Sequence, residues 1–258
     1  MEDSQKSLIW MGGCPTTGKT FTGDYLATRG WHHIDGDGAL QSPDPEVRGL
    51  FLKLNECFEF VLKGEEAPKE KYMPYFEHLA KQIREAQKEH DKVVCTFAIM
   101  NMFGPEFEML KSEFPSMMFI KLCSDLDVMV ERWLERNTRM FEAAGTSMKE
   151  AWAGTMNDPY RKTYGEEYSD DAYRAQAKGL VFAVDWVRIP DEPENKCYNF
   201  WNNDHAGNQA IKDINKLLGL EDIEIDPKAI EAVNMARMKN VDVKAFEAQA
   251  KEMKEAKE

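Results

Sequence analysis

The chain has 258 residues, with 43% hydrophobic and 31% charged residues, a composition typical of folded globular proteins and not of disordered ones. Its 46 acidic and 33 basic residues give a formal net charge of -13. This charge repels phosphate backbones and anionic lipids, so we expect neither nucleic-acid nor membrane-surface binding. The sequence also lacks an apolar run of about 18 residues, the length that a membrane-spanning helix needs.

Four short apolar runs predict buried strands at residues 8–11, 31–34, 92–99 and 117–122, and a fifth, weaker run spans residues 197–201. Each of the first four runs is followed by a longer stretch with helical spacing. This alternation predicts an α/β fold with a parallel sheet covered by helices on both faces. Because the run at residues 92–99 lacks polar alternation, the sheet is expected to be buried on both sides.

Three helices are predicted after these strands, at residues 20–28, 72–92 and about 125–139. The stretch that follows, residues 140–191, is too long for an ordinary connection. It must contain structure of its own or form a mobile lid. Its aromatic side chains could close over a substrate or belong to a small helical unit, and they include Trp152, Tyr160, Tyr164, Tyr168 and Tyr173.

The end of the chain, residues 221–258, is rich in Ala, Glu, Lys and Met and predicts a helical tail. Asp226 and Pro227 mark the start of its helix, since Pro is favoured in the first helical turn. The tail could dock onto its own core, pair with a second copy as a homodimer, or fray. We therefore divide the chain into residues 1–220, with a lid at about 136–191, and the tail.

The strongest motif is Gly-Cys-Pro-Thr-Thr-Gly-Lys-Thr at residues 13–20, which matches GxxxxGK followed by Ser or Thr. It lies between a predicted strand and a predicted helix, as a phosphate-binding loop does. Glycines let the backbone wrap around a phosphate, and the loop N–H groups and the helix N-terminus attract the anion. Lys19 would reach the β- and γ-phosphates, and the Thr20 hydroxyl would bind Mg²⁺. The predicted nucleotide-binding residues of the loop are Gly13, Cys14, Pro15, Thr16, Thr17, Gly18, Lys19 and Thr20.

The five cysteines are odd in number and widely spaced, and no CxxC pair occurs. This pattern argues against a disulfide framework and a zinc site and favours a reducing compartment. Residues 1–7 also lack the basic and apolar regions of a signal peptide, so we expect a cytoplasmic protein. Cys14 lies near a helix N-terminus and Lys19, where the pKa of a thiol tends to fall.

A second motif, Asp35-Gly36-Asp37-Gly38, directly follows the second predicted strand. Ligands of such sheets bind beyond the carboxyl ends of the strands, so both carboxylates could face the phosphate-binding loop. One could hold the Mg²⁺ hydration shell, and the other could accept the proton of a substrate hydroxyl. The motif also fits the loose DxxG pattern of GTPases, but the best later candidate for their NKxD motif, residues 202–204, does not match.

Three arginines, Arg132, Arg136 and Arg139, lie at i, i+4 and i+7 of a predicted helix and share one face. The planar, permanently charged guanidinium suits phosphate clamping. The neighbouring Glu131 and Glu135 would equally support a solvated helix. In combination with the other two motifs, we interpret the arginine face as part of the site.

The order of these motifs resembles the small-metabolite kinases of the nucleoside-monophosphate-kinase-like group, with gluconate kinase nearest and shikimate kinase and adenylylsulfate kinase close behind. The matching segments are residues 13–20, 33–37, 119–122 and 130–132, within about residues 8–140. The resemblance implies a three-layer P-loop fold with a five-stranded parallel sheet in the order 2-3-1-4-5, helices on both faces and an enlarged lid. It also implies ATP as the phosphoryl donor, together with Mg²⁺.

The resemblance assigns roles to residues of this chain by position. Asp35 resembles the acid of the Mg²⁺ shell, and Asp37 the acid that binds the substrate hydroxyl. Arg132 would lie by the adenine or the phosphates, Arg136 would be a lid arginine, and Asn203 would border the adenine. The catalytic candidates are then Lys19, Asp37 and Arg136.

Two departures from gluconate kinases fall where the acceptor is selected. A basic residue is expected shortly after the third strand, where this chain has Ile-Met-Asn-Met at residues 99–102. The segment after Asp37 also lacks their His-Pro and basic pattern. Both departures leave phosphoryl transfer intact and leave the acceptor open. The candidates for acceptor binding are Asp37, Arg48, Asn101 and Arg139.

The sequence therefore predicts a Mg²⁺-ATP-dependent kinase, a transferase that moves the γ-phosphoryl to a hydroxyl of a small polar metabolite. A second hypothesis is an ATP-binding switch or assembly protein with slow hydrolysis and a partner-binding tail. A third is a kinase that acts on a nucleotide or a nucleic-acid end, although the net charge of -13 argues against a long polyanionic substrate.

Overall fold

A computed structural model describes residues 7–143, 145–155, 165, 167–204 and 208–238 of the chain. Its centre is a five-stranded sheet in which every neighbouring pair is parallel, in the order β2-β3-β1-β4-β5. This confirms the predicted fold class and strand order. The strands are β1 (Ser7–Gly12), β2 (His32–Asp35), β3 (Lys92–Thr96), β4 (Met118–Cys123) and β5 (Cys197–Trp201).

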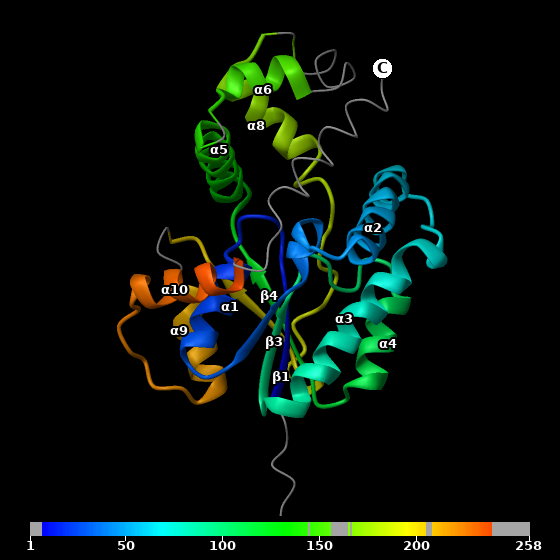
Figure 1. The fold of residues 1–258 in the computed structure, drawn as a ribbon, viewed down its shortest axis with the longest axis vertical. Coiled ribbons are helices and arrows are strands. Elements are labelled where there is room, and N and C mark those ends of the chain that lie inside the picture. The colour runs from blue at the N-terminus through cyan, green and yellow to red at the C-terminus, as the bar shows by residue number, and fades with distance from the viewer. Residues whose placement is uncertain (1–6, 144, 156–164, 166, 205–207, 239–258) are drawn as a thin grey trace, which may run out of the picture.

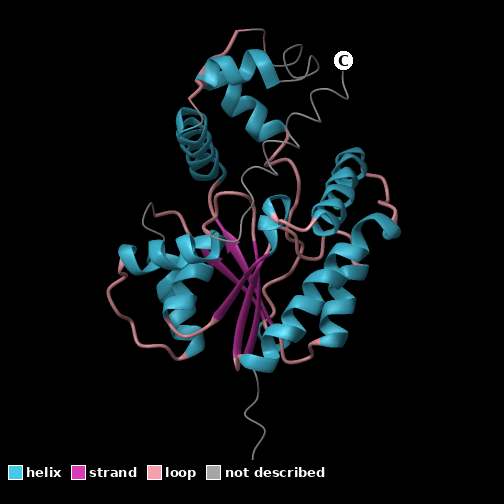
Figure 2. Ribbon diagram, in the orientation of Figure 1, coloured by secondary structure: helices cyan, strands magenta, loops and turns pink. Residues whose placement is uncertain are grey.

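Helices cover both faces of the sheet (Figure 1). The helices α1 (Lys19–Thr28), α9 (Asn208–Leu218) and α10 (Pro227–Met238) lie on one side. The other side carries α2 (Pro45–Lys63), α3 (Lys69–Glu89) and α4 (Pro105–Glu113). Short 3-10 turns follow β2 and precede β5, at η1 (Gly36–Gln41) and η2 (Pro193–Asn195). Figure 2 shows the resulting three layers, with the strands enclosed between helices.

Side chains of β1 alternate between two separate hydrophobic cores. Leu8 and Trp10 face the core on the α3 side, and Ile9 and Met11 face the core on the α1 side. This is the period of two that a strand imposes on its side chains. All four are at most 1% exposed, as expected for a parallel sheet that is covered on both sides.

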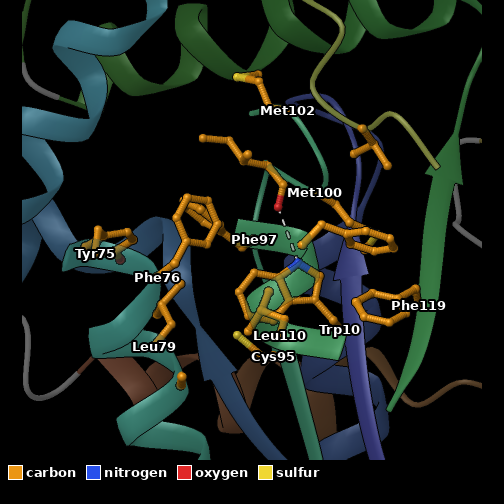
Figure 3. Close-up of a cluster of buried hydrophobic side chains, with 14 of the residues drawn as sticks. Trp10, Tyr75, Phe76, Leu79, Cys95, Phe97, Met100, Met102, Leu110 and Phe119 are labelled. Carbon is orange, nitrogen blue, oxygen red and sulfur yellow. Dashed lines mark hydrogen bonds between the residues drawn. The ribbon is translucent and has the colours of Figure 1, made fainter. Parts of the chain in front are cut away.

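Trp10 anchors the larger core and the chain that leaves β3 (Figure 3). Its indole ring lies 6.3 Å from the Phe76 ring and 6.2 Å from the Phe97 ring. The indole N–H donates a 3.3 Å hydrogen bond to the Ile99 carbonyl. β3 ends at Thr96, earlier than the predicted limit at residue 99. Residues 97–99 continue beyond the end of the strand and are buried.

The insert between β4 and β5 folds largely into helices above the carboxyl edge of the sheet (Figure 1). They are α5 (Leu126–Ala143), α6 (Met148–Thr155) and α8 (Asp170–Gly179). A small core of their own joins Leu134, Met148, Trp152 and Tyr173, with Tyr168 against it. The insert therefore contains structure of its own, one of the two alternatives that its length leaves open, and its aromatics at 152, 168 and 173 belong to a helical unit. Tyr160 and Tyr164 lie outside the described residues.

The chain returns from the insert across the top of the sheet, through residues 180–191, here called the return segment. Met100 N–H donates to the Trp186 carbonyl at 3.0 Å, and Arg188 N–H donates to the Met100 carbonyl at 2.9 Å. These bonds form a parallel bridge between Met100 and Val187. Gly12 lies directly beneath, where a Cβ would come within 3.0 Å of Val187 Cγ2.

The helix α10 of the tail packs against α1 of the same chain. Ile230 is 5% exposed in the core on the α1 side, and Arg237 contacts carboxylates of α1 and β2. The described part of the tail therefore docks onto its own core, one of the three arrangements that the sequence leaves open. Within the described ranges, no helix is both long and apolar enough to pass through a bilayer.

Candidate active site

Residues 13–20 form a tight loop between β1 and α1, and two of its glycines admit no side chain. A Cβ on Gly13 would lie 2.7 Å from the Leu122 carbonyl oxygen, and one on Gly18 would lie 2.7 Å from Asn202 Nδ2. Gly18 also has a φ of 93°, in the left-handed region, which glycine adopts at little cost. At these two positions the loop therefore presents only backbone to whatever binds there.

Hydrogen bonds from distant elements hold the loop in shape. The Asn202 amide Nδ2 donates to the Thr17 carbonyl at 2.7 Å, and the Thr16 hydroxyl donates to the Met129 carbonyl at 3.0 Å. Thr16 has a positive φ of 68°, a conformation that persists where the surroundings enforce it. The loop is thus fixed by α5 and by the chain that follows β5 before any ligand binds.

Arg132 connects the same three elements. Its guanidinium donates to the Asn202 carbonyl at 2.9 Å, to the Asp204 carbonyl at 2.6 Å and to the Thr16 carbonyl at 3.4 Å. Burial lowers the pKa of Arg132 from its ordinary value. The structure therefore places Arg132 beside the loop, as expected, but several of its donors already bind backbone carbonyls.

The neighbouring asparagines differ in their contacts. Asn202 is 3% exposed and bonds to the loop, whereas Asn203 is exposed and forms two bonds with Asp125, at 2.8 and 2.9 Å. Asn203, the residue predicted to border the adenine, thus joins the start of α5 to the end of β5. Asn202 supports the phosphate loop directly.

Lys19 and Asp37 lie together at the mouth of the loop. Lys19 Nζ is 3.5 Å from Asp37 Oδ2 and donates to the Cys14 carbonyl at 3.2 Å. The other oxygen of Asp37 accepts a 2.9 Å bond from the Ala98 N–H. The segment that leaves β3 therefore aims the carboxylate at the lysine, and the structure brings these two predicted site residues together.

Asp35 lies apart from this pair. Its Oδ2 is 2.6 Å from Nη1 of Arg237, and its Oδ1 accepts a bond from the Asp37 N–H at 3.1 Å. It lines a second cavity of about 280 Å³, together with His78 and Arg237. Burial, and next the charge of Asp37, raises the pKa of Asp35. Because the chain turns into η1 directly after Asp35, the two carboxylates have different partners, Lys19 for Asp37 and Arg237 for Asp35. The role of Asp35 in a Mg²⁺ shell stays a prediction.

The main cavity, of about 710 Å³, opens above Lys19 and Asp37. Thr20 and Arg136 also line it, and the Arg136 guanidinium lies 4.5 Å above the centre of the Trp133 ring. Burial lowers the pKa of Arg136, and the nearby charge of Asp37 opposes this shift. The cavity is thus lined by several residues of the loop, by Asp37 of the Asp-Gly-Asp segment and by Arg136 of the arginine face.

The three other predicted acceptor residues are held elsewhere, and none of them is among the described residues that line this cavity. Arg48 donates to the Ser42 carbonyl, and Asn101 Nδ2 donates to the Arg188 carbonyl at 2.7 Å. Arg139 is 77% exposed and lies 3.9 Å from Glu135. These contacts support local structure, so the acceptor side of the cavity is built from other residues.

One face of α2 supplies much of that side and was not predicted from the sequence. Phe51, Leu54, Asn55 and Phe58 all line the cavity, and their spacing of i, i+3, i+4 and i+7 places them on one helix face. Asp44 accepts the N–H of Glu46 at the start of this helix, directly before a proline. The periodic spacing of the α2 face and the Asp-Pro step at the start of the helix were both present in the sequence. Trp186 of the return segment also lines the cavity, but no local pattern in the sequence indicates this position.

Cys14 differs from its prediction. Burial raises the pKa of its thiol, and the opposing influence of Lys19 and Lys121 is smaller. The expected fall near the helix N-terminus is therefore wrong, because desolvation of the thiolate outweighs the attraction of the neighbouring ammonium groups.

The residues of the cavity fit a Mg²⁺ ion that arrives with a nucleotide. In the described part of the chain, no group of three or more His, Cys, Asp or Glu could hold a metal. Mg²⁺ characteristically takes only one or two protein carboxylates and completes its shell with phosphates and water. The Thr20 hydroxyl lines the same cavity and could bind such an ion together with phosphate oxygens and water.

No protein-family model and no curated protein matches the sequence. Solved structures with a similar fold include a sugar kinase from Janibacter sp. HTCC2649, at 15% identity and a TM-score of 0.46, covering 83% of this chain and 95% of that chain. A gluconokinase from Sinorhizobium meliloti 1021 follows at 13% identity and 0.43, covering 83% and 97%. Shikimate kinase from Bacteroides thetaiotaomicron follows at 15% and 0.41, covering 83% and 99%. Likeness this distant says nothing about a substrate, so function rests on the residues of the site.

Proposed function

We propose that the chain is a Mg²⁺-ATP-dependent phosphotransferase that moves the γ-phosphoryl of ATP to a hydroxyl group of a small molecule. The observation that carries the proposal is the 3.5 Å approach of Lys19 Nζ to Asp37 Oδ2, at the mouth of the loop and inside a cavity of about 710 Å³. A phosphate-binding lysine and a carboxylate that can orient a hydroxyl group and take its proton are two of the recurring parts of phosphoryl-transfer sites.

Each residue then has a separate task. The loop N–H groups and Lys19 hold the phosphates and stabilise the charge that develops on the transferred group. The Thr20 hydroxyl would bind the Mg²⁺ ion, which supplies further charge neutralisation. Asp37 orients the acceptor hydroxyl and takes its proton, and its bond from Ala98 N–H fixes the carboxylate for this purpose.

The helix α5 would exclude water from the reaction. It contributes Trp133, Arg136 and Met140 to the cavity from above. Exclusion of water strengthens the electrostatic contacts and prevents hydrolysis of ATP in place of transfer. Arg136 would reach the transferred phosphoryl from this side, opposite Lys19.

The chemistry also fits the expected location of the protein. All five cysteines are free thiols, as expected in a reducing compartment such as the cytoplasm.

The alternative of an assembly protein with a free, partner-binding tail finds less support. The described tail helix packs on α1 of its own chain, and a roomy cavity adjoins Asp37, where a switch would need no acceptor.

The test is phosphate transfer from γ-labelled ATP into a pooled library of hydroxyl compounds that covers aryl alcohols, polyols, sugar acids and nucleosides. Lys19→Ala should abolish the labelled product, and Lys81→Ala, an exposed lysine of α3, should not. ATP binding with no labelled product from any acceptor would contradict the proposal and favour the switch.

A further inference from the structure

The part of the main cavity that lies beyond Lys19 and Asp37 is walled chiefly by hydrocarbon. We propose that the acceptor is an alcohol with a flat, largely apolar body, of the aryl or aryl-alkyl class, and not a polyol or sugar acid. This inference rests on the proposed function, because it names the acceptor class of the same site. It also reverses the polar acceptor that the motifs predict.

The first wall combines α2 with the return segment. Phe58 of α2 and Trp186 have ring centres 4.8 Å apart in an edge-to-face arrangement of 65°. The Trp186 indole N–H donates to the Val181 carbonyl at 2.7 Å, so its polar atom is already paired within its own segment. The two rings therefore line the cavity with aromatic carbon.

The floor and the roof have the same character. Phe97 and Ile99, each 1% exposed, form the floor where the chain leaves β3. Phe51 joins this floor to α2, with its ring centre 6.4 Å from that of Phe97. From above, α5 contributes Trp133 and Met140, and Met140 is 52% exposed. Half-open apolar surface that lines a concave site is typical of a binding pocket for an apolar ligand.

The cavity lining has three charged side chains among the described residues, Lys19, Asp37 and Arg136. Lys19 and Asp37 lie together at the loop, and Arg136, which stacks 4.5 Å from the centre of the Trp133 ring, is influenced by the charge of Asp37. Beyond them, the uncharged polar side chains among the described lining residues of the acceptor region are Gln41 and Asn55. This arrangement suits one reacting hydroxyl at the polar end and one or two polar substituents elsewhere.

A sugar acid would find too few polar partners among the described residues that line the cavity. It carries a hydroxyl on nearly every carbon and a carboxylate at its end, and each group buried without a partner weakens binding. Arg48 and Arg139, which could have paired with a carboxylate, are engaged outside the cavity. An aromatic ring, in contrast, gains from stacked and edge-to-face contacts with the walls.

The size of the cavity sets the scale of the ligand. A volume of about 710 Å³ lies in the range of sites for drug-sized molecules, roughly 300 to 1,000 Å³. Part of this space lies over the loop and belongs to the transferred phosphoryl. The remainder accommodates more than a single ring, so a bicyclic or biphenyl body should bind better than benzyl alcohol.

The experiment uses the full chain and two panels of acceptors. The aryl panel is benzyl alcohol, naphthylethanol and biphenylmethanol, and the polar panel is xylitol, glucose and gluconate. Binding of each compound is measured by calorimetry in the presence of a non-hydrolysable ATP analogue, and transfer is measured separately with γ-labelled ATP. We expect the larger aryl alcohols to bind at least about tenfold more tightly than any polar compound.

Variants on one helix provide the matched control. Phe58→Ala removes a ring from the wall and should weaken aryl-alcohol binding by roughly tenfold, while binding of the ATP analogue and the thermal melting profile show that the loop and fold persist. Leu62→Ala alters a side chain of α2 that is 50% exposed and lies outside the cavity lining. This variant should bind both the aryl alcohols and the ATP analogue as the wild type does.

The two proposals fail in different ways. Tight aryl binding without transfer to any compound would support the apolar acceptor site and contradict phosphotransfer. Preferred binding or phosphorylation of xylitol, glucose or gluconate would support phosphotransfer and overturn the apolar acceptor. Absence of binding by both panels, or unchanged aryl binding in Phe58→Ala, would also overturn it.

Discussion

Arg237, in the last turn of α10, forms an ion pair with Asp35 at the end of β2, with 2.6 Å between Nη1 and Oδ2. The Nε of the same guanidinium lies 3.2 Å from Oδ1 of Asp24 in α1, and His33 Nδ1 forms a 2.8 Å hydrogen bond with the same oxygen. The tail helix therefore balances the charge of the first acid of the Asp-Gly-Asp motif, although the two segments lie at opposite ends of the chain.

Removal of this guanidinium should destabilise the protein. Asp24 is 1% exposed, and a buried carboxylate that loses one partner of a paired network typically costs about 3–5 kcal/mol. Because His33 would remain, we expect Arg237→Ala to lower the free energy of unfolding by about 2 kcal/mol. Urea denaturation measures this change. Lys228→Ala, on the exposed side of the same helix, should stay within about 0.5 kcal/mol of the wild type.

Asp24 should also set part of the acid sensitivity. Burial disfavours its charge, but the hydrogen bonds from His33 and Arg237 outweigh burial and lower the pKa of Asp24. A lowered pKa stabilises the folded state above the unfolded value of about 3.9, and this contribution is lost as the pH falls through the folded value. Asp24→Asn should therefore be less stable near neutrality and should lose less stability on acidification.

Asp35 provides the opposite case for the same experiment. Its pKa is raised by burial and by Asp37, so its contribution is present at low pH and declines as the pH rises through the folded value. For each of Asp24→Asn and Asp35→Asn, the free energy of unfolding is measured between pH 3 and 7 and the wild-type value is subtracted. The two differences, plotted against pH, should have slopes of opposite sign. Equal slopes would refute the assignment of these two environments.

Substitution of Asp37 should separate binding from transfer. Asp37→Asn keeps the shape of the side chain and can still contact Lys19 and Ala98, but it cannot take the acceptor proton. We expect ATP to bind as before and the transfer rate to fall by roughly 10²–10⁴-fold, the usual contribution of a general base. Single-turnover transfer and ATP-binding calorimetry test this together, and normal turnover would show that Asp37 has another role.

The two arginines that end the predicted face on α5 should differ sharply. Arg136 lines the cavity, whereas Arg139 is 77% exposed beside Glu135. Arg136→Ala should reduce kcat by roughly 10²-fold, as expected on loss of a donor to the transferred charge, and Arg139→Ala should leave kcat and KM nearly unchanged. If both variants behave alike, Arg136 does not contact the phosphoryl group.

Gly18 and Gly30 form a matched pair for the loop. Both have a positive φ, 93° and 85°, but a Cβ on Gly18 would lie 2.7 Å from Asn202 Nδ2, and one on Gly30 would meet no described atom within 4 Å. Gly30→Ala should therefore cost only the backbone strain, about 1–2 kcal/mol. Gly18→Ala should in addition displace Asn202 and weaken ATP binding, which calorimetry would detect.

The fold was predictable because its signals are local. The three central strands β3, β1 and β4 contain apolar runs that are largely buried, and the spacing of its glycines and lysine marks the loop at residues 13–20. Helix α10 likewise begins at Pro227, as the Asp-Pro step predicts. Such patterns depend only on neighbours in the chain, so a sequence read alone contains them.

The acceptor side was not predictable to the same degree, because it depends on which distant residues meet. The Asp-Gly-Asp pattern does not reveal that one carboxylate faces Lys19 and the other Arg237. The three predicted polar residues were selected for their chemistry, and the fold uses them for backbone contacts. The periodic face of Phe51, Leu54 and Phe58 and the Asp-Pro start of its helix were readable in the sequence. Trp186, which contacts Phe58 at the cavity, arrives from the insert.

The bridge between Met100 and Val187 has a consequence for how such proteins diversify. It fastens the return segment to the chain that leaves β3, so Trp186 reaches the cavity from the insert, whereas Lys19 comes from α1 and Asp37 from η1. The wall at Trp186 and the lysine and carboxylate at the loop therefore belong to separate stretches of the chain. Exchange of the return segment alone should alter the wall at Trp186 and leave Lys19, Asp37 and Arg136 in place.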